Sequence, residues 1–199
     1  MMRNESSLDM ETIGIRGFLL YTYFHLEDLQ RDNDLPARRE DDMIQPIDIE
    51  DNHQVLELLM LQQLSYRVEA ERIGFDEIPP LFDSPKTIRE SGEQFFGYYE
   101  GQQLAGAVSV KQGTKELTIC RLMVHPSFFR RGIATQLLQY AEQFAMPGMA
   151  VKVSTGTNNE PAVLLYGKHG YEAGQVLEIA PNVTLTVFHK RIPYEKAET

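Results

Sequence analysis

The sequence predicts an α/β (α+β) fold in which helices cover both faces of a mixed central β-sheet. Segments with helical apolar spacing alternate along the chain with β-like runs. Three of these runs follow one another through the short connections typical of hairpins. Hydrophobic residues make up 42% of the 199 residues, enough to bury one main core. Strands that alternate with helices in this way imply a sheet with helices packed on it.

The chain divides into a main domain and a shorter N-terminal extension. Residues 1–42 combine an apolar segment, residues 13–26, with a charged tract around Pro36 that has the composition of a solvated linker. The apolar segment contains Arg16 and is too short to span a bilayer, so we interpret it as a soluble helix with one apolar face. Residues 43–194 form the predicted domain, and residues 195–199 form a C-terminal tail.

The first elements of the domain are a strand and a long helix. The alternating isoleucines after Met43 predict a short strand, and Asp51 or Asn52 is a candidate N-cap for the helix that follows. This helix is expected to end near Gly74, before a proline-rich loop or a second short helix beginning near Ser84. Apolar residues at helical spacing are expected to form its buried face: Val55, Leu56, Leu59, Met60 and Leu64.

The rest of the domain reads as three strands, a helix, a strand, a helix and two strands. Residues 94–99, 103–112 and 116–124 predict an antiparallel meander. A helix then begins near Ile133, and Pro147 and Gly148 end it. The stretch AVKVST predicts the next strand, NEPAVLLYGKHG predicts a helix, and two final strands turn at the dipeptide PN.

Charge and cysteine content exclude several classes of function. The net charge of −10 and the isoelectric point of about 5.0 disfavour nucleic acid as a general partner, because its binding relies on clustered Lys and Arg. The single cysteine, Cys120, precludes an intramolecular disulfide, and the sequence has no Cys/His cluster typical of a metal site. We therefore expect a cytoplasmic protein without a metal and without a membrane anchor.

Two adjacent arginines precede a glycine where a strand turns into a helix. The strand ends at His125 and Pro126, and the helix starts near Gly132, which leaves N–H groups at the helix N-terminus for an anion. Arg130 and Arg131 add two planar donor groups suited to phosphate oxygens. A solvated arginine pair is the alternative, but the combination favours a diphosphate ligand.

Two sequence blocks carry a family resemblance. The stretch VHPSFFRRGIATQLL resembles the acyl-CoA pyrophosphate loop of the GNAT superfamily of N-acetyltransferases, with Gly132 and Ala134 at its small positions. Phe129 stands where the family usually has Gln or Arg. The stretch NEPAVLLYGKHGYE resembles the family's next block, and the matching residues are Asn159, Ala162, Leu165, Tyr166, Lys168, Gly170 and Tyr171. The resemblance spans about residues 43–192.

The resemblance implies acetyl-CoA as a cosubstrate. Its pantetheine arm would lie between two splayed parallel strands, residues 116–124 and 150–155, against backbone groups of Leu122, Met123 and Val124. The candidate diphosphate loop consists of Arg130, Arg131, Gly132, Ile133, Ala134 and Thr135. The second block adds the candidate cofactor residues Asn159, Ala162, Tyr166 and Lys168.

The resemblance also implies the chemistry of acetyl transfer. Tyr166 lies at the family's general-acid position, where a hydroxyl protonates the departing thiolate. The family's strand glutamate falls on Thr118, so Glu116, two residues earlier on the same face, is the candidate base. Cys120 is read as a small buried residue, and not as a nucleophile. Side chains of the first helix and the following loop are candidates to receive the acceptor: Tyr66, Arg67, Glu69, Asp76 and Glu77.

The sequence therefore predicts an N-acetyltransferase that moves an acetyl group from acetyl-CoA to an amine of a small molecule or protein by direct attack. The alternative is a non-catalytic module that binds or senses acyl-CoA. The apolar face of residues 18–26 has to be buried on its own domain or on a second subunit, which leaves a homodimer open.

Overall fold

The computed structural model describes residues 43–194, so the predicted extension and tail lie outside the described residues. The strands are β1 Met43–Pro46, β2 Gln94–Glu100, β3 Gln103–Gln112, β4 Glu116–Val124, β5 Ala150–Gly156, β6 Glu172–Ala180 and β7 Val183–Arg191. The helices are α1 Asn52–Ile73, α2 Pro85–Arg89, α3 Ile133–Glu142 and α4 Glu160–Lys168, with single 3₁₀ turns η2 Pro79–Phe82 and η3 Pro126–Phe128. Every element predicted for this range is present.

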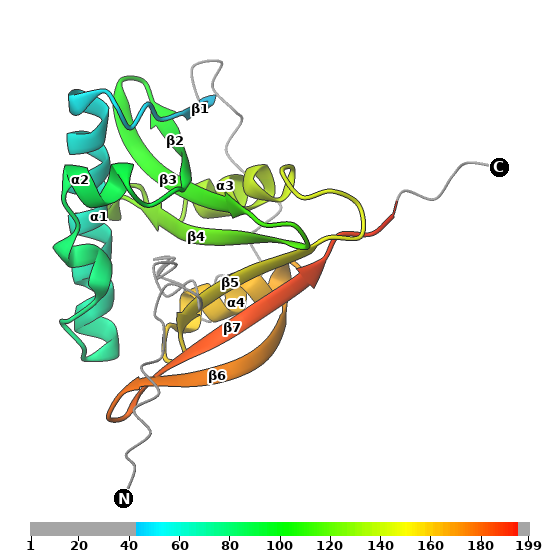
Figure 1. Cartoon of the computed structure of the whole chain (residues 1–199). Helices are drawn as coiled ribbons and strands as arrows, with labels where there is room; N and C mark the ends of the chain where they lie inside the picture. The colour runs from blue at the N-terminus through cyan, green and yellow to red at the C-terminus, as the bar shows by residue number, and fades with distance from the viewer. Residues whose placement is uncertain (1–42, 195–199) are drawn as a thin grey trace, which may run out of the picture.

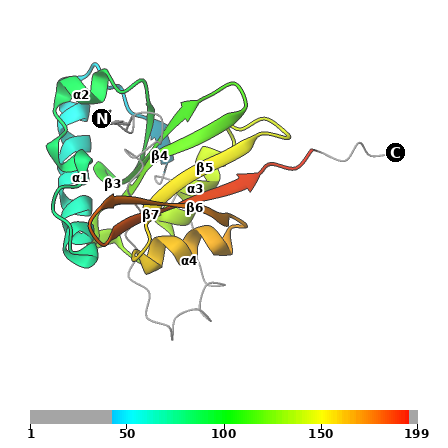
Figure 2. The ribbon, with the colours of Figure 1, turned by 60° about the horizontal axis from the view of Figure 1, so that its bottom comes forward.

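The strands form one seven-stranded sheet in the order β1-β2-β3-β4-β5-β7-β6. All neighbouring strands are antiparallel except β4 and β5, which are parallel. One buried cluster joins α1 and α2 to one face of the sheet, and a second joins α3 and α4 to the other face, as Figures 1 and 2 show. The predicted mixed sheet with helices on both faces is thus confirmed.

A β-bulge at Cys120 divides β4 into two halves with opposite side-chain parity. Opposite β3, the register moves from Ile119 directly to Arg121, so Cys120 is the extra residue. Before the bulge Ile119 packs toward α3 and α4, whereas after it Leu122 packs there. The same shift turns Arg121 toward α1, where it contacts Gln62. The bulge therefore brings a charged residue under α1.

The predicted boundaries of α1 are correct, but its predicted buried face is only partly so: Val55 is buried and Leu59 packs against the core. Asp51 caps the first turn and Gly74 ends the helix in the left-handed conformation. Three residues expected in the core are instead 54%, 67% and 43% exposed: Leu56, Met60 and Leu64. The buried stripe includes three polar residues with partners of their own: Gln62, Ser65 and Glu69. No helix between residues 43 and 194 is long and apolar enough to cross a membrane.

Gly106 on β3 allows α3 to begin close to the sheet. A Cβ atom at this position would lie 2.9 Å from the Ile133 side chain and from the Met123 carbonyl oxygen, and 3.0 Å from the Leu137 side chain. Such approaches are shorter than real Cβ contacts allow, so only glycine fits without a shift. The N-terminus of α3 is consequently held against the end of β4.

Candidate functional site

The parallel strands β4 and β5 pair over three residues and then separate. Their register consists of Glu116 with Ala150, Leu117 with Val151 and Thr118 with Lys152. Beyond these pairs the two ribbons diverge toward α1 (Figure 1). We call residues 119–124 of β4 and residues 153–156 of β5 the splay. The splayed geometry expected for these two strands is present.

Helix α1 crosses the open end of the splay and contacts both of its sides. The Ser65 hydroxyl donates to the Val124 carbonyl at the end of β4, at 2.9 Å. One turn later, Glu69 accepts a hydrogen bond from the Asn159 amide at 3.3 Å, and the same amide donates to the Thr155 hydroxyl of β5 at 3.1 Å. Ser65 and Glu69 are four residues apart, so they lie on the same face of the helix. Two polar side chains of α1 thus link the diverging strands.

A buried carboxyl and two buried phenols lie together at this end of the splay. Glu69, Tyr66 and Tyr166 each have 0% exposed surface. Burial raises the pKa of Tyr66 and of Tyr166, and the nearby Glu69 carboxylate raises each of them further. Burial also raises the pKa of Glu69 well above its ordinary value, although the Asn159 hydrogen bond opposes this shift. We call these three side chains the carboxyl–phenol cluster.

One polar atom of each cluster member is left without a hydrogen-bond partner. Within residues 43–194, no group bonds to the Tyr66 hydroxyl, to Glu69 Oε2 or to the Tyr166 hydroxyl. Leaving a buried donor or acceptor unpaired costs about 1–3 kcal/mol for each group. Such groups in native proteins usually have a ligand, a water molecule or a catalytic role. The cluster therefore has the properties of a binding or reaction site.

The candidate diphosphate loop has the predicted helix N-terminus and an unusual backbone. Gly132 is the N-cap of α3, with φ of 75°, and offers no side chain that would occupy the first turn. Arg130 also has a positive φ, 65°, which costs a non-glycine residue free energy and is found preferentially at ligand sites. The Arg131 guanidinium lies 2.9 Å from a Glu100 carboxylate oxygen and over the Phe128 ring. Arg131 is therefore held at the loop by partners that compete with an anion.

Several predicted cofactor residues have buried side chains, so their backbone is what a ligand can reach. Leu122, Met123 and Val124 are at most 1% exposed, as are Ile133 and Ala162. The Ala134 side chain is also buried, whereas the Thr135 side chain is partly exposed. Phe129, just before the loop, packs against both core clusters. Lys168 is exposed in the last turn of α4.

The candidate base Glu116 lies at the closed end of the splay. It belongs to the first register pair and forms an ion pair with Lys152 at 3.3 Å. The adjacent Leu117 packs in the cluster that contains Tyr166, so the alternation of side chains directs Glu116 to the other face. The structure thus does not bring Glu116 and Tyr166 together. Cys120 is buried, and burial raises the pKa of its thiol to about 12, which disfavours a nucleophilic thiolate.

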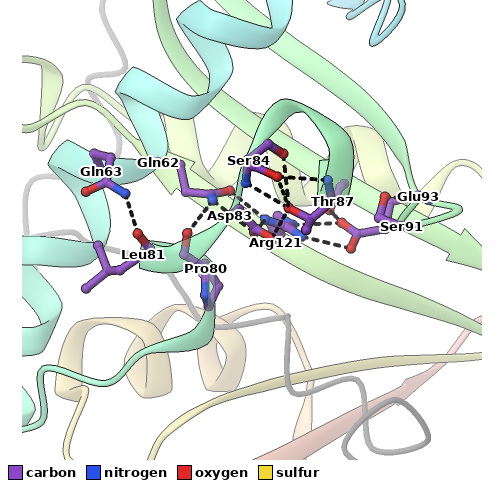
Figure 3. Close-up of polar contacts among 11 residues, drawn as sticks. Gln62, Gln63, Pro80, Leu81, Asp83, Ser84, Thr87, Ser91, Glu93 and Arg121 are labelled. Atoms are coloured by element: carbon purple, nitrogen blue, oxygen red, sulfur yellow. Dashed lines mark hydrogen bonds and ion pairs between the residues drawn. The ribbon is translucent and has the colours of Figure 1, made fainter. Parts of the chain in front are cut away.

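A buried polar network between α1 and β4 holds the loop that follows α1. The Arg121 guanidinium lies 2.8 Å from Glu93 and 2.6 Å from Asp83, and it donates to Gln62 at 2.6 Å (Figure 3). Ser109 donates to Glu93 at 2.6 Å. These five residues are called the Arg121 network. Gln62 also donates to the Pro80 carbonyl, so the network joins α1, β4 and the η2 turn.

A comparison with protein families decides the classification. The model of the acetyltransferase (GNAT) family matches residues 54–171, which span the splay, the arginine loop and α4. The chain belongs to this family. The GNAT match covers more than half of the chain and includes every residue of the two blocks that fits the family pattern.

Known GNAT structures and one curated relative resemble the chain. UPF0157 protein YqkA of Bacillus subtilis is 41% identical over 133 residues, which cover 67% of this chain and 39% of that protein. The ribosomal-protein-S18-alanine N-acetyltransferase of Escherichia coli superimposes with a TM-score of 0.60 at 13% identity, covering 79% of this chain and 98% of that one. PaiA N-acetyltransferase of Thermoplasma acidophilum, solved with coenzyme A, has a TM-score of 0.54 at 17% identity, covering 77% and 99%. These two structures show the same GNAT fold.

Sequence reasoning named Glu69 only among several acceptor candidates and did not single it out. Its hydrogen-bond partner Asn159 is 90 residues away in the chain, and neither residue forms a motif with the other. One signal was available in the sequence. The polar residues Gln62, Ser65 and Glu69 recur at intervals of three and four along α1, which places them on the same face of this helix.

Proposed function

We propose that this GNAT domain transfers an acetyl group from acetyl-CoA to an amine of a small molecule or protein. The observation that carries the proposal is the splay, which leaves two strand edges facing each other and ends at the N-terminus of α3. Family membership and the structure of PaiA N-acetyltransferase, which was solved with coenzyme A, support the same cosubstrate. The N-acetyltransferase named above, which acts on an alanine of a ribosomal protein, supports an amine as acceptor.

The residues of the site suit acetyl-CoA in two places. At the start of α3, the N–H groups that no helical carbonyl can reach, together with the helix dipole, favour the negative diphosphate. Arg130 and Arg131 supply charge there, and Arg131 would exchange its Glu100 partner for phosphate oxygens. Along β4, backbone groups of residues 122–124 would bind the pantetheine arm and stabilise the negative charge that develops on the thioester oxygen.

Tyr166 is the proposed general acid. Burial and Glu69 raise its pKa, so the phenol keeps its proton over the physiological pH range. A thiolate that departs beside it would accept that proton. Because the buried Cys120 thiol is poorly ionised, the amine would attack the acetyl group directly, without an acetyl-cysteine stage.

The test combines calorimetric titration with acetyl-CoA and a turnover assay. The Arg130→Ala, Arg131→Ala double variant should bind acetyl-CoA at least about tenfold more weakly, since charge-assisted hydrogen bonds contribute about 1.5–3 kcal/mol each. Lys111→Ala, Lys115→Ala is the matched control, because it removes two positive charges from the exposed end of β3 and the turn that follows it. Tyr166→Phe should bind acetyl-CoA with normal affinity, but its turnover, measured as CoA formed in the presence of an amine, should be slower.

Each result has a distinct meaning. Wild-type protein that binds no acetyl-CoA would refute the proposal. Binding without transfer to any of spermidine, L-lysine or a peptide beginning with alanine would favour a non-catalytic acyl-CoA module. Equal weakening in the arginine and lysine double variants would show a general charge effect instead of a diphosphate site.

A further inference from the structure

We propose that Glu69 of α1 is the group that accepts the proton of the amine substrate. This inference rests on the proposed acetyl transfer and assigns its missing base. Glu69 lies at the open end of the splay, where its Oε1 accepts from Asn159 and its Oε2 has no hydrogen-bond partner among residues 43–194. The Glu69 side chain is fully buried, so Oε2 is an acceptor held inside the protein and not a solvated surface group.

Two links place the carboxyl beside the acid that would act on the thioester. Asn159 is the N-cap of α4, the helix that carries Tyr166, and its amide reaches both Glu69 and Thr155 of β5. The Glu69 carboxylate is also near enough to raise the pKa of the Tyr166 phenol, in addition to the effect of burial. A carboxyl and a phenol that enter one site from opposite faces of the sheet can handle the two protons of an acyl transfer separately.

The surroundings of Glu69 make it a stronger base than an exposed carboxylate. The titratable groups that act on it or respond to it are Tyr66 and Arg72 on α1 and Tyr166 on α4, while Asn159 and Thr155 are neutral. Burial raises the pKa of Glu69, and the Asn159 hydrogen bond and Arg72 oppose the shift. A general base is most effective when its pKa lies near the working pH, whereas an exposed carboxylate is too weak a base.

The proton balance closes with these two residues. The substrate ammonium gives one proton to the Glu69 carboxylate, and the nitrogen lone pair attacks the acetyl carbonyl carbon. As the C–N bond forms, the C–S bond breaks and the thiolate takes the Tyr166 proton. The second N–H proton, released when the amide forms, restores the phenol. The products are the amide, CoA thiol and a protonated Glu69 that releases its proton to solvent.

The structure favours Glu69 over the strand carboxylate for this role. Glu116 is 44% exposed at its side chain, is paired with Lys152 and lies at the closed end of the splay. Glu69 lies at the opposite end of the splay, beyond the paired residues, where β4 and β5 have separated. An amine that enters between these strand ends would meet Glu69 before it could reach Glu116.

The experiment measures kcat/KM against pH for the full chain, with whichever amine of the panel above the wild type acetylates fastest. Glu69→Gln keeps the size and the Asn159 hydrogen bond but cannot accept a proton. At pH 7 it should lower kcat/KM about 10²–10⁴-fold, the usual contribution of a general base. The loss should shrink as the pH approaches the pKa of the free amine, which is about 10 for an alkylamine and about 8 for a peptide N-terminus, because a deprotonated amine needs no base. The matched control is Glu71→Gln, an exposed residue of the same helix, which should leave the profile unchanged.

Acetyl-CoA affinity and melting temperature are measured in parallel, and Glu69→Asp provides a second variant that retains a carboxyl group. Glu69→Asp should keep the acid limb of the profile at a reduced rate. A Glu69→Gln loss that is the same at every pH would indicate a structural role and overturn the inference, as would an unchanged kcat/KM. Loss of the acid limb in Glu116→Gln instead would assign the base to β4. A wild type that acetylates none of the amines refutes the proposed function itself, and this inference with it.

Discussion

Burial gives the Glu69 carboxyl group a pKa unlike that of an exposed carboxyl group. Its pKa is raised because burial removes the water that would solvate its charge, and the one hydrogen bond from Asn159 only partly compensates. A side chain held in this way costs stability at neutral pH. Such costs are retained where a site needs a base of intermediate strength.

The pH dependence of stability should reveal this cost. A raised folded-state pKa means that the contribution of Glu69 is most favourable below its unfolded value, about 4.5, and is lost as pH rises toward the folded pKa. Glu69→Gln should therefore be more stable than the wild type at pH 8, and the advantage should decrease toward pH 5 by at most about 1.4 kcal/mol per pH unit. Urea unfolding at several pH values measures it; a difference independent of pH would contradict the buried charge.

Among individual residues of the candidate site, those that belong to a sequence motif were easier to predict than the others. Tyr166, Asn159 and the loop around Gly132 were accessible because they belong to two continuous blocks with fixed spacing. The role of Glu69 was not, because its partners Asn159 and Tyr166 come from α4 and meet it only in the folded chain. Contacts across 90 residues leave no local signal.

Among the elements, α1 differs most from its sequence prediction. Apolar spacing correctly predicted a helix from Asp51 to Gly74 but selected Leu56, Met60 and Leu64 as its buried face. Gln62 and Ser65 are buried instead, because the Arg121 guanidinium and the Val124 carbonyl provide hydrogen bonds that a hydropathy pattern does not include. The period of a helix is readable from sequence, whereas its orientation depends on its polar partners.

The Arg121 network should be the main polar support of this helix. Burial alone would lower the pKa of Arg121, but Glu93 raises it, so the guanidinium stays charged. Arg121→Met leaves Glu93 and Asp83 buried without a cation and should lower the free energy of unfolding by about 3–5 kcal/mol. Chemical denaturation measures the loss.

The matched control for Arg121→Met is Lys111→Met, which removes a cation from an exposed position on the neighbouring strand β3. It should change stability by less than about 0.5 kcal/mol. A similar small effect for both variants would mean that the buried network contributes little to the position of α1 and η2.

At the scale of the whole molecule, the fold class was predictable because every boundary between elements has a local signal. The turns carry Gly, Pro or Asn, and the helices carry caps such as Asp51 and Ser84. The order of strands in the sheet has no such signal, and the family resemblance implied only the parallel pair formed by residues 116–124 and 150–155. The 133 residues that match the 41% identical relative make up only 39% of that protein, so the chain spans less than half of its length.

We predict that residues 43–194 fold and bind acetyl-CoA without the remainder of the chain. Within this range, the sheet and the four helices share two buried clusters, which provide a hydrophobic core on each face of the sheet. The shortened protein should have a melting temperature within a few degrees of the full chain and the same dissociation constant for acetyl-CoA. Calorimetry measures both quantities. A large loss of either would show that residues 1–42 contribute to the domain, and sedimentation of both proteins would show whether they do so through a second subunit.

The three residue pairs between β4 and β5 have a mechanical consequence. They divide the sheet into two half-sheets, β1–β4 and β5–β7, which share one short seam. A small rotation about this seam changes the separation of the far strand ends and leaves the pairing inside each half-sheet intact. Glu116 and Lys152 face each other across the seam. The carboxylate that the sequence suggested as a base would thus lie at the pivot of such a rotation, and the hydrogen bonds of Ser65 and Glu69 would limit the opening at the opposite end.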